Sequence, residues 1–132
     1  MFDELMNYIN EQINITNAEI KQGFYSPVGS PEHAKRQFLH DAELVGTQDA
    51  LYSIRKIDKP SFSKIAGYVD IEIDNINNEI ENVNKRAITS VEDKKNIEFM
   101  SHGLNGALSA YMGVHSKVYE ILDKYDDKNI KL

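Results

Sequence analysis

The sequence predicts an all-α fold, either an up-down-up-down four-helix bundle or an intertwined helical oligomer. Four stretches repeat apolar residues every three or four positions, as amphipathic helices do. Turn-forming residues separate the stretches, and short connections favour antiparallel neighbours. The chain has 132 residues and no cysteine, so a single domain (residues 1–132) with a core of packed side chains is expected.

The first helix is expected over residues 2–22, because its apolar residues alternate spacings of four and three and therefore share one face. The stripe consists of Phe2, Met6, Ile9, Ile13, Thr16 and Ile20. Gly23 follows and suits a C-terminal stop.

The second helix is expected over residues 31–57, with Ser30 as its N-cap and Pro31 as its first residue. Its apolar residues form two neighbouring lines. These are Phe38, Ala42, Val45 and Tyr52, and Leu39, Ala50, Ile54 and Ile57. Gly46 in the middle weakens the helical pattern.

The third helix is expected over residues 60–87 and carries the clearest heptad repeat in the chain. Its stripe consists of Phe62, Ala66, Val69, Ile73, Ile76, Ile80, Val83 and Ala87. A competing pattern lies near residues 66–74, where apolar and polar residues alternate with period two, as they also do in residues 51–57. Pairing of the two segments would give a small hairpin in an α+β fold. The helix is favoured because the heptad continues on both sides of the ambiguous segment.

The fourth helix is expected over residues 91–125, after a capping box formed by Thr89 and Glu92. Its large apolar stripe consists of Ile97, Met100, Leu104, Leu108, Tyr111, Val118, Leu122 and Tyr125. At 1.5 Å per residue this helix would be about 50 Å long. It therefore projects beyond its neighbours or breaks near Gly103.

Composition narrows the functional classes. The net charge of −6 argues against nucleic acid binding, which needs a basic footprint. No apolar run approaches the roughly 20 residues that cross a membrane, and the acidic N-terminus is unlike a signal peptide. We therefore expect a cytoplasmic protein that does not bind membranes. Abundant Ile and Asn are typical of AT-rich genomes, such as those of low-GC bacteria and their phages.

Small residues gather on the fourth helix. Each glycine in a helix interior costs about 1 kcal/mol relative to alanine, so three of them need a structural or functional reason. Close packing against a neighbouring helix of the same chain is one reason, and a seam for self-association or partner binding is another. The predicted interaction face consists of Gly103, Gly106, Ala107, Ala110 and Gly113.

The sequence contains no motif for catalysis or metal binding. It lacks a nucleophile elbow, a His-Glu-x-x-His pair, a Walker loop and a dinucleotide fingerprint. A metal-dependent hydrolase would need His33, His40 and Glu43 together with a histidine from another helix, His102 or His115. Surface or capping roles suit these histidines better, so we predict no catalytic residue, no metal and no cofactor.

An up-down-up-down topology would bring the starts of the second and fourth helices to the same end as a set of basic residues. Free N–H groups of two helix starts, loop hydroxyls and an aromatic ring would suit a phosphate or a nucleotide there. The predicted ligand-binding residues are Tyr25, Ser26, Gly29, Ser30, Lys35, Arg36, Lys85, Arg86, Lys94 and Lys95. Ordinary turn and capping preferences explain the same residues equally well.

Two functional hypotheses follow. The first is a non-enzymatic helical interaction or inhibitor-type protein that binds another macromolecule, with a protein partner and a homo-oligomeric state. A phage or mobile-element modulator of a host factor fits this size and composition. The alternative is binding or sequestration of a phosphorylated small molecule, such as a nucleotide, at the basic end.

Overall fold

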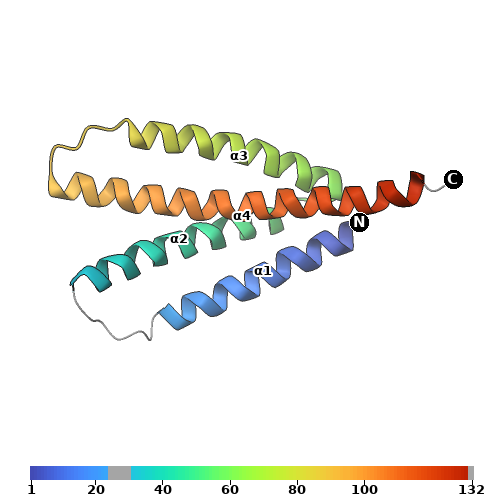
Figure 1. Cartoon of the computed structure of the whole chain (residues 1–132), viewed down its shortest axis with the longest axis horizontal. Coiled ribbons are helices and arrows are strands. Elements are labelled where there is room, and N and C mark those ends of the chain that lie inside the picture. Colours follow the sequence, from blue (N-terminus) through green and yellow to red (C-terminus); the bar gives the residue numbers. More distant parts are fainter. Residues whose placement is uncertain (24–30, 131–132) are drawn as a thin grey trace.

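The computed structural model describes residues 1–23 and 31–130, with the side chains of these residues other than 23, 31, 33 and 127–130. In this part of the chain there are four helices, α1 (Phe2–Gly23), α2 (Pro31–Arg55), α3 (Phe62–Asn84) and α4 (Val91–Ile130), and no strand. The helices alternate in direction, so the bundle runs up, down, up and down (Figure 1). The all-α prediction is confirmed, and the hairpin alternative is wrong because residues 51–55 and 66–74 are helical.

The observed ends of the helices differ by a few residues from the predicted ends, because local capping and turn conformations fix them. α3 begins at Phe62 because Ser61 adopts an extended N-cap conformation and its hydroxyl accepts a hydrogen bond from the Lys64 N–H. α2 ends at Arg55, two residues before the expected end. In the connection that follows, Lys59 has a φ of 47°, which no helix residue adopts.

Ser90, rather than Thr89, caps α4. The Asp93 N–H donates to Ser90 Oγ at 3.0 Å, and the Asp93 carboxylate accepts hydrogen bonds from the backbone N–H and the hydroxyl of Thr89. Ser90 is therefore the N-cap, one residue later than the predicted capping box, and the Asp93 carboxylate reaches back to Thr89 rather than to the N–H of Ser90. The hydrogen bonds from Thr89 hold the pKa of Asp93 below its ordinary value, because they favour the ionised carboxylate.

The hydrophobic core is concentrated at one end of the bundle. We call this the closed end; α1 and α3 begin there and α2 ends there (Figure 1). Its most deeply buried side chains are Leu5, Ile9, Leu51, Ile54, Ile65, Val69, Val114 and Ile121. Tyr111 is also buried and makes a hydrogen bond with Tyr68 at 3.4 Å. Burial, and then this hydrogen bond, raises the pKa of Tyr111, so its hydroxyl stays protonated.

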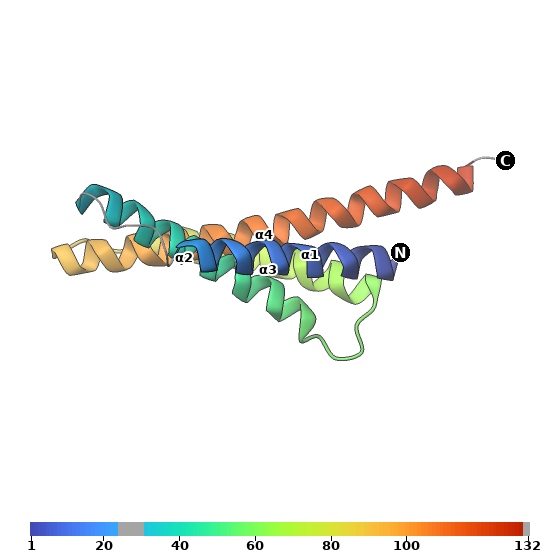
Figure 2. The same cartoon turned by 90° about the horizontal axis from the view of Figure 1, so that it is seen from below.

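The opposite end, which we call the open end, is where α2 and α4 begin and α1 and α3 end. Few large side chains are buried there, and the helix pairs spread apart (Figures 1 and 2). Phe38 and Val45 of the predicted α2 line remain 51% and 45% exposed. Their helical spacing is regular, but none of the four described helices covers them at this end.

α2 and α4 make the closest helix contact of the bundle. A Cβ built on Gly46 would lie 2.0 Å from the Gly103 carbonyl oxygen, and one built on Gly106 would lie 1.9 Å from the Glu43 carbonyl oxygen. Thr47 Oγ1 also donates to the Gly106 carbonyl at 3.0 Å. Only glycine permits backbones to approach this closely, so Gly46 and Gly106 have a structural reason within the chain.

α4 is a continuous helix of 40 residues and does not break at Gly103. At 1.5 Å per residue it is about 60 Å long, whereas its neighbours have 22 to 25 residues. Its C-terminal part therefore extends past the closed end of the bundle (Figures 1 and 2). Within residues 1–23 and 31–130, no helix combines the length and apolar character needed to span a bilayer.

Candidate interaction site

The open end carries a group of exposed, large apolar side chains. Val91 is 73% exposed and Phe99 is 44% exposed, in addition to Phe38 and Val45. Isolated exposed apolar residues are common on proteins, but a contiguous set marks a candidate binding surface. Two grooves divide this surface.

The first groove lies between the N-terminal parts of α2 and α4 and has a volume of about 580 Å³. We call it the Lys groove. Its lining consists of Ala34, Lys35, Phe38, Leu39, Val91, Lys94, Lys95 and Glu98. Lys35 forms an ion pair with Glu98 at 3.2 Å, whereas Lys94 and Lys95 have no partner among the described side chains. An apolar floor next to two lysines without an ion-pair partner among the described side chains suits an amphipathic, negatively charged ligand surface.

The second groove lies between α2, α3 and α4 and has a volume of about 500 Å³. We call it the three-helix groove. Its apolar lining consists of Ala42, Val45, Val83, Phe99, Met100, Leu104 and Ala107, with Gly46 and Gly103 at the helix contact. Its polar lining consists of Asp49, Glu79, Asn82 and Arg86. An apolar floor with a mixed polar rim is typical of a protein interaction surface.

An aromatic pair joins the two grooves. Phe38 lines the Lys groove, Phe99 lines the three-helix groove, and their ring centroids lie 5.2 Å apart at an angle of 34°. This distance is within the range of favourable aromatic contacts. The two rings hold α2 and α4 apart beyond their close contact at Gly46.

Only some of the residues of the predicted anion site lie close together in the structure. Tyr25, Ser26, Gly29 and Ser30 lie outside the described residues. Lys35, Lys94 and Lys95 share the Lys groove, and Arg86 lines the three-helix groove, where its guanidinium donates to Met100 Sδ at 3.7 Å. Arg36 and Lys85 are exposed and line neither groove. Glu92 and Asp93, in the first turn of α4, offset part of the positive charge.

The predicted small-residue face lies within the bundle. Gly103 and Gly106 meet α2, and Ala107 and Ala110 are partly buried against the core. Gly113 faces α1, where an added Cβ would lie 2.9 Å from the Tyr8 hydroxyl. Packing inside one chain therefore accounts for much of this face. Its use by a partner stays a prediction.

The described histidines of α4 each face one carboxylate. His115 Nδ1 lies 2.9 Å from Asp70 Oδ1, and His102 Nδ1 lies 3.9 Å from Glu43 Oε2. Among the side chains that the structure describes, no group of three or more His, Cys, Asp or Glu residues could hold a metal ion. The His33 side chain lies outside that set, and His40 is exposed.

Sequence reasoning missed Phe99 and Val91 as surface residues of the open end. Both residues lie off the main apolar stripe of α4. An apolar residue outside the stripe that packs into the core is expected to be exposed, and this pattern could have identified them. Comparison of the chain with protein-family models, with curated proteins and with solved structures finds no match. The arrangement therefore defines an all-α bundle with an apolar, two-groove open end, and its function is argued from that geometry.

Proposed function

We propose that this chain is a non-enzymatic interaction protein that binds an amphipathic helix of a protein partner in the three-helix groove. The main support is a set of exposed apolar side chains that line a groove, which no helix among residues 1–23 and 31–130 covers. Val45, Phe99 and Met100 are all exposed there, although each would be buried by a helix laid along the groove. Helix-in-groove recognition uses such a floor for affinity.

The chemistry of the lining supports this occupant. Phe99 offers a large, rigid contact area, and the flexible thioether of Met100 adapts to the side chains of a partner. Asp49, Glu79 and Arg86 provide both signs of charge around the apolar floor. Such a rim selects a helix with polar residues flanking its apolar stripe rather than a wholly apolar ligand.

Substitutions in the groove test the proposal. Val45→Glu and Met100→Glu place a charge on the floor, whereas Ile71→Glu places the same charge on an exposed apolar residue of α3 outside the groove. All three positions are exposed, so each variant should stay within about 0.5 kcal/mol of wild-type stability. A partner captured from an extract of the source cells should be retained by Ile71→Glu and lost by both groove variants.

Direct binding completes the test. The captured partner is purified, and its affinity for each variant is measured by isothermal titration calorimetry. We expect the two groove variants to weaken binding at least tenfold, because each replaces an apolar contact by a carboxylate that must lose its hydration at the interface. Equal affinity for all variants would remove the three-helix groove from the binding surface.

The hypothesis of a phosphorylated small molecule stays a second prediction, supported only by the uncompensated Lys94 and Lys95. Thermal shift assays with nucleotides, cyclic nucleotides and inorganic phosphate test it. A ligand present at 100 times its Kd adds about 2.7 kcal/mol of stability. A shift that disappears in a Lys94→Ala, Lys95→Ala variant supports this function, and no shift with any of the ligands contradicts it.

A further inference from the structure

α4 presents one long outward face to solvent. Residues seven apart along this face are Val91, Glu98, Asn105, Met112, Tyr119 and Asp126, and all except Glu98 are exposed. The N-terminal part of the face forms a wall of the Lys groove. Its C-terminal part, which we call the acidic stripe, consists of the exposed residues Met112, Ser116, Tyr119, Asp123 and Asp126. Met112 and Tyr119 are each 52% exposed, so the stripe combines apolar anchors with carboxylates.

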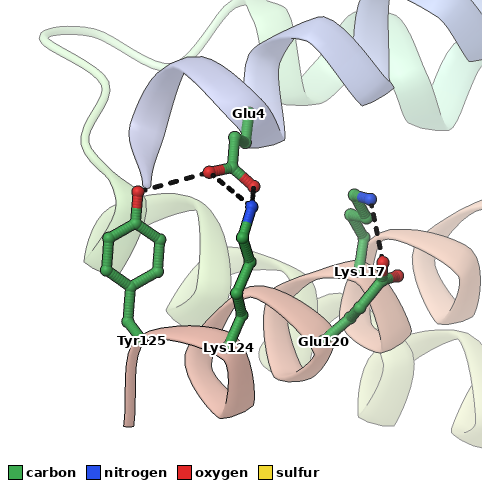
Figure 3. A network of polar contacts seen from close by, with 5 residues as sticks. All are labelled: Glu4, Lys117, Glu120, Lys124 and Tyr125. Carbon is green, nitrogen blue, oxygen red and sulfur yellow. Dashed lines mark hydrogen bonds and ion pairs between the residues drawn. The ribbon is translucent and has the colours of Figure 1, made fainter. Parts of the chain in front are cut away.

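Two carboxylates of the acidic stripe have no ion-pair partner among the side chains that the structure describes. Lys117 and Lys124, which lie nearby on α4, are already paired. Lys124 lies 3.4 Å from Glu4 of α1, and Lys117 lies 3.3 Å from Glu120 (Figure 3). Asp123 and Asp126 have no partner among the described side chains. The two ends of the outward face thus carry opposite charges, with Lys94 and Lys95 at one end and the two aspartates at the other.

The two ends cannot meet within one chain. Lys94 and Asp123 are 29 positions apart in a single continuous helix, which separates them by about 44 Å. A second copy of the chain running antiparallel would bring them together. The register that sets Lys94 opposite Asp123 of the second copy also sets Val91 opposite Asp126, Glu98 opposite Tyr119 and Asn105 opposite Met112. A single two-fold axis therefore brings the lysines of each copy next to the aspartates of the other copy.

We propose that two copies of this chain form an antiparallel, two-fold dimer through the outward face of α4, with the acidic stripe of each copy seated on the Lys groove of the other. Tyr119, which this register sets opposite Glu98, contacts the part of the apolar floor formed by Phe38 and Leu39. Asp123 and Asp126 pair with Lys94 and Lys95. Because the contact is isologous, the assembly closes as a dimer. The three-helix groove shares no lining residue with the Lys groove and is not used in this contact. This proposal is independent of the function proposed for that groove.

A charge exchange tests the dimer. The first variant is Lys94→Glu with Lys95→Glu, and the second is Asp123→Lys with Asp126→Lys. Light scattering over a concentration series should show the wild type at twice the 15.1 kDa mass of the chain. Each variant alone places like charges at both contacts and should raise the dimer Kd about 10- to 100-fold. An equimolar mixture of the two variants restores opposite charges at both contacts and should restore the dimer.

A matched control separates the contact from a general effect of charge. Asp74→Lys with Glu81→Lys changes two exposed acidic residues on α3 in the same way. This variant should dimerise like the wild type. Circular dichroism establishes that each variant remains helical. A monomeric wild type, variants that dimerise normally, a control that also dissociates, or a mixture that stays monomeric would each overturn the proposal.

Discussion

Alanine substitutions at Gly46 and Gly106 test the close contact between α2 and α4. The new Cβ of Gly46→Ala would lie 2.0 Å from the Gly103 carbonyl oxygen, and that of Gly106→Ala would lie 1.9 Å from the Glu43 carbonyl oxygen. Ordinary contacts begin at 3.4 Å. The obstructing atoms belong to helix backbone and cannot rotate away, so α2 and α4 must separate by more than 1 Å at their contact.

The expected cost follows from three effects. Overpacking against a rigid neighbour costs up to about 3 kcal/mol. Separation of the helices also removes the Gly106 carbonyl from the Thr47 hydroxyl, but this hydroxyl keeps the Glu43 carbonyl, also at 3.0 Å, as its acceptor, so this loss is small. Alanine returns about 1 kcal/mol through its higher helix propensity. Each substitution should therefore lower the free energy of unfolding by about 2 kcal/mol.

Urea unfolding followed by circular dichroism measures this change, and two other glycines provide controls. A Cβ on Gly103 would lie 3.8 Å from its nearest neighbour, and a Cβ on Gly67 would have nothing within 4 Å. Alanine at either position should leave stability unchanged or raise it by up to about 1 kcal/mol. The reasoning fails if Gly106→Ala is as stable as wild type, or if Gly103→Ala is destabilised as strongly as Gly106→Ala.

Two further predictions concern a helix cap and the uneven core. Because the pKa of Asp93 is lowered by folding, its stabilising effect is complete above its ordinary pKa of 3.8 and is lost as pH falls through the folded value. Wild type should thus be more stable than Asp93→Asn at neutral pH, and the difference should vanish in acid titrations of thermal stability. Ile121→Ala at the closed end should cost about 3 kcal/mol in urea unfolding, whereas Phe99→Ala at the open end should cost about 1 kcal/mol, because Phe99 is half-exposed. Equal losses would contradict a one-sided core.

The fold could be predicted from the sequence because apolar residues recur with helical spacing in all four segments. The heptad of α3 outweighs the alternation of residues 66–74, since a period that continues over many turns fixes one buried face. Helix ends were less predictable. Thr89 and Ser90 are both good N-caps, and only the position of the Asp93 carboxylate decides between them.

The candidate site could be predicted only in part. The clustering of Lys35, Lys94 and Lys95 follows from topology, which the alternating helices already imply. The exposure of Phe38 and Val45 does not follow from it, because these residues keep the same spacing as buried ones. Whether such a residue is covered depends on how far apart two helices lie, and a periodic pattern carries no information on that separation.

The close contact and the open grooves have a common physical origin. Gly46 and Gly106 let α2 and α4 touch backbone to backbone in the middle of the bundle. Toward the open end, the rings of Phe38 and Phe99 stand between the same two helices. Small residues at one level and large residues at the next require the helices to diverge, because side-chain size sets the distance between packed helices. The two aromatic rings thus keep the helices apart at the end where the exposed apolar side chains lie. The apolar surface buried at the closed end stabilises this arrangement.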